Sequence, residues 1–378
     1  DLSLDDRAYE DDPNRSQSDK LITVDLRYSQ SLASWWKHAV TVDVAMNDGL
    51  ETDKEDAADP GESLSSRSRS IMLNAKWQNL FTMGEFNKLT VGAEYFMTML
   101  MNDYNAQSFE GMTSNYTSGA MRMIAAPYVR DTAVFFKTLT VDAGVRFSYD
   151  FDTLSAGAFD YRVAASYVLE AIHSTLHASY SHATRYPYGM QRLQAAEYRS
   201  LVPETLEHSV EAGVKQRIFG TLTMDASARF DVITNAVMFS VSDGRYTNAP
   251  GASVLSATAA AAFAPSSRFS ASLSYTYALA NYLVTGSFIP EIPRHSARAD
   301  VAFEPIEKLV VSAGIQYIGP RDSIQSSGAG NSYVVLLDYG LVDIGASYTW
   351  ESFDFFVKAE NILSLIPLLR PAVDVAGY

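Results

Sequence analysis

Residues 221–232 read TLTMDASARFDV, and polar and apolar side chains alternate along the whole stretch. Thr, Thr, Asp, Ser, Arg and Asp occupy the odd positions, whereas Leu, Met, Ala, Ala, Phe and Val occupy the even ones. Because successive side chains of a β-strand point to opposite faces of a sheet, this period of two predicts a strand with one polar and one apolar face. The fold of the chain therefore depends on what the apolar face contacts.

The same alternation recurs along the chain. Clear repeats are TLTVDAGVRFSYD at 138–150, LEHSVEAGVK at 206–215 and RFSASLSYTY at 268–277. No stretch shows a helical period of about 3.6 residues that competes with it. Sixteen strands are predicted in this way, at 21–29, 38–47, 66–77, 88–96, 121–130, 138–150, 161–169, 174–182, 206–215, 221–232, 252–264, 268–277, 297–303, 309–317, 341–350 and 353–361.

The connections between these strands alternate in length. Short turns, such as RIFG at 217–220 and EPIEK at 304–308, alternate with longer segments along the chain. A sheet with short turns at one end and long loops at the other is typical of a bacterial transmembrane β-barrel. The long connections are predicted at 47–63, 101–118, 182–205, 233–251, 278–295 and 318–340.

The polar face of the strands carries charges that need water. A large soluble β-sandwich or propeller is the alternative fold, but its dry core would bury Asp142, Arg146, Asp225 and Arg229 on one side of the sheet. A wet lumen solvates these groups, while lipid covers the apolar face. No stretch approaches the roughly 20 apolar residues of a membrane-spanning helix. The predicted fold class is all-β, a transmembrane antiparallel β-barrel.

Charge and composition exclude several functions. The 378-residue chain has a net charge of −15, which argues against nucleic acid as a partner. It has no cysteine, which excludes disulfides, thiolate catalysis and cysteine-ligated metals. The acidic segments DLSLDDRAYEDD (1–12) and ETDKEDAAD (51–59) are either solvated loops or, on the same side of the barrel, a calcium site, because calcium takes oxygen ligands. The candidate calcium ligands are Asp5, Asp6, Asp11 and Asp12.

Several motifs lie in a fixed order on the predicted strands. They are ASYSHATRYPYGMQRL (178–193, a strand running into an Arg-aromatic-Pro loop), LVPETLEHSVEAGVK (201–215, a Pro-Glu-Thr motif and its strand), IPRHSARADVAF (292–303, Pro-Arg-His), GIQYIGPR (314–321, a strand end) and VKAENILS (357–364). These motifs resemble those of the TonB-dependent receptor family of outer-membrane transporters. Each motif is weak alone, but their order and spacing on the predicted strands are specific, and the resemblance covers about residues 20 to 378.

The resemblance implies a barrel of 22 strands, of which about 16 are visible. The family's N-terminal plug domain and energy-coupling box are not recognisable, and PAVDVAGY (371–378) stops where the family continues into a last strand. We therefore expect an acidic extracellular loop at 1–19 and a partial barrel without a plug at 20–378. Open strand edges are not tolerated in lipid, so further strands or another chain would cover the seam.

The resemblance also implies a function. It points to a receptor in the bacterial outer membrane, among lipid and lipopolysaccharide, that imports a large scarce nutrient such as a ferric siderophore or cobalamin. A TonB-type protein would couple energy to it if a plug is present. The alternative is a plugless, receptor-derived barrel that is a structural scaffold subunit of an outer-membrane assembly, or a passive pore. The sequence has no convincing catalytic constellation, so we do not expect an enzyme.

Side chains on the long loops are the candidate ligand-binding residues. Exposed aromatics on loops above a rigid barrel suit the capture of a bulky ligand. Alternatively, these rings pack the loops against one another or form the upper aromatic girdle. The candidates are Tyr104, Phe109, Tyr116, Arg185, Tyr186, Tyr188, Tyr246 and Phe288.

Overall fold

The computed structural model describes residues 2–3, 16–54, 63–107, 113–152, 157–193, 195, 200–240, 243–327, 330–351 and 353–362. Strands make up most of these ranges, which also contain the short helix α1 (Gly189–Leu193) and a 3-10 turn (Glu170–Ile172). Within the described part, no helix is long and apolar enough to cross a membrane.

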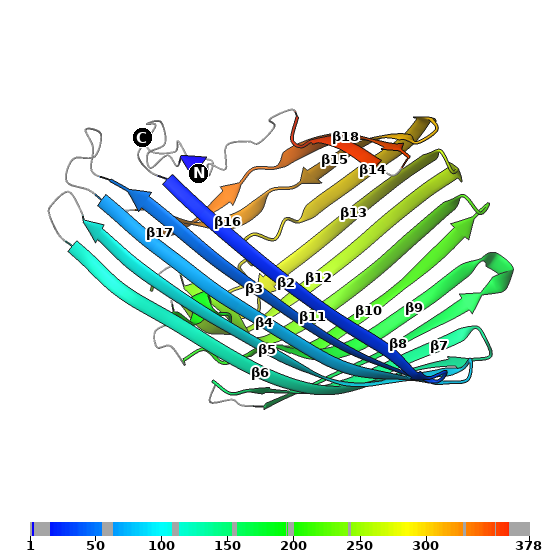
Figure 1. Cartoon of the computed structure of the whole chain (residues 1–378), viewed down its shortest axis with the longest axis horizontal. Coiled ribbons are helices and arrows are strands. Elements are labelled where there is room, and N and C mark those ends of the chain that lie inside the picture. Colours follow the sequence, from blue (N-terminus) through cyan, green and yellow to red (C-terminus); the bar gives the residue numbers. More distant parts are fainter. Residues whose placement is uncertain are drawn as a thin grey trace. The chain divides into compact units, whose positions relative to one another are not determined.

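The strands follow one another antiparallel (Figure 1). They are β1 (Leu2–Ser3), β2 (Ser16–Ala33), β3 (Trp36–Asp53), β4 (Ser63–Met83), β5 (Asn87–Gln107), β6 (Thr113–Phe135), β7 (Leu139–Asp150), β8 (Gly157–Leu169), β9 (Ser174–Arg185), β10 (Glu204–Ile218), β11 (Leu222–Ser240), β12 (Arg245–Ser266), β13 (Phe269–Tyr282), β14 (His295–Ile306), β15 (Leu309–Ile318), β16 (Arg321–Ser327), β17 (Gly330–Leu336), β18 (Tyr339–Trp350) and β19 (Phe353–Ala359).

All sixteen predicted strands are confirmed, as β2 to β15, β18 and β19. Three predicted long loops are wrong. In 101–118, β5 continues to Gln107 and β6 begins at Thr113, so Tyr104 lies on a strand and not on a loop. In 233–251, β11 continues to Ser240 and β12 already begins at Arg245, and 318–340 contains the β16–β17 hairpin. The physical reason is that these strand ends lack strict polar and apolar alternation. In 236–239 four apolar residues follow one another, and Ala236 packs in a small buried cluster with Ala249, Ala252 and Tyr282.

The chain divides into two compact units. Unit 1 comprises 1–132, 144–161 and 186–203, and unit 2 comprises 133–143, 162–185 and 204–378. Unit 1 contains the meander β2-β3-β4-β5-β6, and unit 2 contains the meander β9-β10-β11-β12-β13-β14-β15-β18-β19.

The sheet of unit 1 has one polar and one apolar face. On the polar face, Glu94 of β5 bridges two cations: Lys76 Nζ lies 3.1 Å from its Oε1 and Arg146 Nη1 lies 2.9 Å from its Oε2. Trp77 of β4 lies on the apolar face, next to Val40 of β3 in register. The predicted two-faced pattern is therefore present in unit 1.

The opening stretch of sequence forms β11 in unit 2. Its Phe230 pairs with Val210 of β10 and with Leu255 of β12, so that apolar side chains lie side by side across three strands. Phe230 is 46% exposed, and Val210 is 50% exposed. A continuous exposed apolar surface of this kind is unfavourable in water, and is the surface that lipid covers in a transmembrane barrel.

Candidate functional site

The segment Tyr186–Leu193, here called the inner segment, leaves the sheet directly after β9. Pro187 has no backbone N–H, so the ladder ends there, and α1 follows. Gly189 lies close to the polar face of unit 1: a Cβ built on it would meet Leu100 of β5 and Ala120 of β6, each at 3.5 Å. The inner segment therefore packs against the polar face of the sheet.

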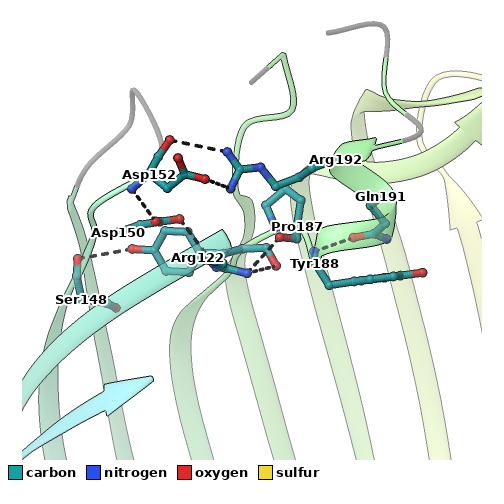
Figure 2. A network of polar contacts seen from close by, with 9 residues as sticks. Arg122, Ser148, Asp150, Asp152, Pro187, Tyr188, Gln191 and Arg192 are labelled. Atoms are coloured by element: carbon teal, nitrogen blue, oxygen red, sulfur yellow. Dashed lines mark hydrogen bonds and ion pairs between the residues drawn. The ribbon is translucent and has the colours of Figure 1, made fainter. Parts of the chain in front are cut away.

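Arg122 of β6 holds the beginning of the inner segment (Figure 2). Its Nη1 donates to the carbonyl oxygens of Tyr186 at 3.3 Å and Pro187 at 2.9 Å. Its guanidinium carbon lies 4.6 Å from the centre of the Tyr186 ring, which adds a cation–π contact. One arginine thus fixes the backbone and a ring of the segment.

Asp150, the last residue of β7, and Asp152, just after the strand, neutralise the arginines. Asp150 Oδ2 lies 3.4 Å from Arg122 Nε, and Asp152 Oδ2 accepts a 2.7 Å hydrogen bond from Arg192 Nη1 of α1. The Asp152 N–H donates to Asp150 Oδ1 at 2.9 Å, which joins the two pairs. Because Arg122, Asp150 and Arg192 are all buried, each buried charge needs the opposite charge beside it.

Tyr186 is half-buried and closes the network. Its hydroxyl donates to the carbonyl oxygen of Ser148 at 3.3 Å. Burial raises the pKa of the Tyr186 phenol above its ordinary value. The ring therefore anchors the inner segment to β7 in the described structure.

Tyr188 is the exposed ring of the inner segment. It is 54% exposed, and its ring points away from Arg122 (Figure 2). Its backbone N–H donates to Gln191 Oε1 at 3.1 Å, which fixes the turn beneath it. A rigid base that presents one exposed aromatic is suited to contact a ligand.

A second polar site lies in unit 2, in a cavity of about 230 Å³ whose lining includes Phe288, Arg294 and Arg321. Arg294 stacks on Phe288, with its guanidinium carbon 3.8 Å from the ring centre. Arg321 is nearly buried and forms a 3.0 Å ion pair from Nε to Glu291, but its Nη1 is buried with no hydrogen-bond partner. Among the described residues, no carboxylate forms an ion pair with Arg294. The cavity thus holds guanidinium hydrogen-bonding capacity that the chain leaves unused.

The structure distributes the other predicted site residues. Arg185 forms an ion pair with Glu204 at 3.0 Å, Tyr246 packs against Phe239 with ring centres 5.3 Å apart, and Tyr104 lines a groove beside Arg67. Among the predicted residues that the structure describes, Tyr186 and Tyr188 lie together on the inner segment. The remaining predicted residues lie outside what the structure describes: Phe109, the side chain of Tyr116, and the calcium candidates Asp5, Asp6, Asp11 and Asp12.

The sequence did not single out the four charged residues of the network. Arg122 sits in the apolar stretch MRMIAAPY, and Asp150 and Asp152 flank Phe151 in YDFD. An arginine among apolar residues, on the polar face of its strand, indicates a buried ion pair. Its partner, Asp150, lies 28 positions later in the chain and is identified only from the folded structure.

Comparison with known proteins supports one family. The model for the β-barrel of TonB-dependent receptor-like proteins matches residues 1–362. No curated protein matches the chain.

Solved structures share the fold. A copper transporter, OprC, is 15% identical with a TM-score of 0.73, and covers 93% of this chain and 60% of its own. The siderophore receptor PiuA from Acinetobacter baumannii is 16% identical with a TM-score of 0.68, at 94% and 61% coverage, and the ferric citrate transporter FecA is 14% identical with a TM-score of 0.64, at 93% and 58%. The chain thus spans about three fifths of the length of these structures.

Proposed function

The chain belongs to the family of TonB-dependent receptor-like β-barrels, which are bacterial outer-membrane proteins, and we propose on this premise that it forms the barrel of a nutrient importer. The observation that carries the proposal is the family match over residues 1–362. The exposed apolar face around Phe230 supports it, because an importer of this family has to span the outer membrane on its strands.

The proposed cargo is an anionic metal chelate, such as a ferric siderophore. Arg294 and Arg321 offer guanidinium donors beside the Phe288 ring, and guanidinium groups recognise carboxylate and other oxygen anions through paired hydrogen bonds. A cavity of about 230 Å³ is smaller than a typical drug-sized site, so it suits one arm of a larger chelate rather than the whole. Tyr188 and Tyr104 are proposed as further contacts for the bulk of the ligand.

Energy coupling through a TonB-type protein is proposed as well. The family match over residues 1–362 supports this part of the proposal. Uptake should then depend on the proton-motive force and on the coupling protein.

An uptake assay tests the proposal. The full gene is expressed in a bacterial strain that lacks its own receptors, and labelled ferric hydroxamate, ferric catecholate, ferric citrate and cobalamin are supplied separately. We expect uptake of an anionic iron chelate that stops when the coupling protein is deleted. Arg294→Gln with Arg321→Gln should weaken that uptake about tenfold or more, since each hydrogen bond to a charged group is worth about 1.5–3 kcal/mol.

Arg268→Gln is the matched control, because Arg268 lies in the turn between β12 and β13, away from the cavity lining. Uptake of none of the four compounds would contradict the importer. Steady conductance of the purified protein across a planar bilayer would instead favour a passive pore.

A further inference from the structure

The apolar face of unit 1 has a sharp border. Across β2, β3 and β4, one register row consists of Ile22, Met46 and Ile71. The next row on the same face, two residues further along each strand, consists of Lys20, Asp48 and Arg69. Side chains two apart on a strand share a face, so three strands change from apolar to charged at one level.

The border lies at the edge of a membrane-thick apolar band. At the other end of β4, Phe81 stacks with Trp36 of β3, with ring centres 5.8 Å apart. Ile71 and Phe81 are ten residues apart, which is about 33 Å along a strand and about 23–27 Å along the membrane normal at a tilt of 35–45°. This agrees with the outward apolar band of about 25 Å in bacterial barrels, which aromatic side chains flank.

Above the border, cations outnumber carboxylates. Arg67 donates twice to Asp48, from Nε at 2.8 Å and Nη2 at 2.7 Å, and Arg69 Nη2 lies 2.7 Å from Asp103. Lys20 is exposed, and no ion pair joins it to a carboxylate in the described part of the chain. We call Lys20, Arg67 and Arg69, with Asp48 and Asp103, the border cluster. Its charge is positive in a chain whose net charge is −15.

A groove opens beside the border cluster. It has a volume of about 500 Å³, and its lining includes Leu50, Arg67, Asp103 and Thr117. The side chain of Arg67 is 47% exposed, so its two bonds to Asp48 orient the guanidinium without burying it. A guanidinium that is already oriented and accessible can bind an oxyanion with little further loss of side-chain conformational entropy.

We propose that the border cluster binds the phosphates of the diphosphorylated glycolipid (lipid A) in the outer leaflet. This rests on the proposed placement of the barrel in the outer membrane. Acyl chains cover the apolar row of Ile22, Met46 and Ile71, and the phosphates reach the cations of the next row. The cluster lies at the end of β4 and β5 that carries the long connections, which is the predicted extracellular end, and this favours a lipid of the outer leaflet over one of the inner leaflet.

The test uses the complete purified protein in detergent. Bound lipid is measured by native mass spectrometry during titration with diphosphoryl lipid A, monophosphoryl lipid A or phosphatidylglycerol. We expect diphosphoryl lipid A to bind most tightly and with the strongest dependence on salt. The variant K20Q/R67Q/R69Q should bind it at least tenfold more weakly. The affinity of the single variant R67K should lie between those of the parent and the triple variant, because lysine keeps the charge but lacks the paired N–H donors of the guanidinium.

The control variant, R268Q/R298Q/K358Q, removes the same charge from residues of unit 2 and should bind like the parent. Equal binding by the two triple variants, or equal binding of phosphatidylglycerol and diphosphoryl lipid A by the parent, would overturn the proposal. If the first triple variant does not fold, K20Q and R67Q are measured singly and should each weaken binding. Nutrient uptake is not part of the readout, so failure of lipid binding and failure of the importer are distinguishable.

Discussion

Arg122 and Asp150 form a buried ion pair across β6 and β7: Arg122 Nε lies 3.4 Å from Asp150 Oδ2, and their side chains are only 10% and 0% exposed. The same arginine holds the carbonyls of Tyr186 and Pro187. A single side chain therefore compensates a buried carboxylate and attaches the inner segment to the sheet.

Arg122→Gln should destabilise the protein strongly. It leaves the Asp150 carboxylate buried without a counter-ion, which typically costs about 3–5 kcal/mol. Chemical unfolding of the protein in detergent or vesicles measures the loss. In the double variant R122Q/D150N both charges are absent, so most of the loss should be recovered. A double variant no more stable than Arg122→Gln would show that the ion pair is not the source of the effect.

Tyr186→Phe should make stability less sensitive to alkaline pH. Because burial raises the Tyr186 pKa, the contribution of the phenol is fully present below its unfolded value of about 10. Above that value the unfolded chain loses the proton first, so the contribution declines until the pH passes the folded pKa. The parent should therefore lose more stability than Tyr186→Phe when the pH rises above about 10. Parallel pH profiles of the two proteins would contradict this.

The period of two was enough to locate β2 to β15, β18 and β19, because one face of each of these strands is apolar and the other is polar. It failed at 233–251, where Phe239 pairs with Tyr246 beyond the regularly alternating stretch. There the backbone pairing continues, but four apolar residues follow one another at 236–239, so polar and apolar residues no longer alternate in the sequence. Lengths of strand ends are therefore not predictable from periodicity.

The inner segment was only partly predictable for a different reason. Tyr186 and Tyr188 both stood out as aromatic residues on a loop, but their roles differ because their partners lie far away in the sequence. Tyr186 contacts Ser148 and Arg122, whereas Tyr188 is exposed. Which ring anchors and which is free depends on tertiary packing. Composition of the loop does not contain that information.

The two faces of β11 should respond oppositely to a new charge. Phe230→Arg places a guanidinium on the apolar face, where lipid makes it cost about 2–4 kcal/mol near the middle of the membrane. Ser227→Arg places the same group on the polar face and should cost less. Reversible folding into lipid vesicles gives both free energies of unfolding. Equal costs at the two positions would be incompatible with a lipid-facing apolar side.

The two ends of β13 should lie on opposite sides of the membrane. The strand runs from the short turn after Ser266 to the turn at Leu283–Gly286, and its length of 14 residues is enough to cross a band of about 25 Å at the usual tilt. The Leu283–Gly286 turn is part of the longer connection between β13 and β14, and longer connections lie on the extracellular side of such barrels. The residues of this turn are exposed. An epitope tag inserted between Thr285 and Gly286 should bind antibody on intact cells, whereas a tag between Ser266 and Ser267 should bind only after the outer membrane is permeabilised. Gly286 has φ +67, so the insertion is made before it and the glycine is kept. Antibody binding to the Ser266 tag on intact cells would reverse the assigned orientation, and it would also move the border cluster away from the outer leaflet.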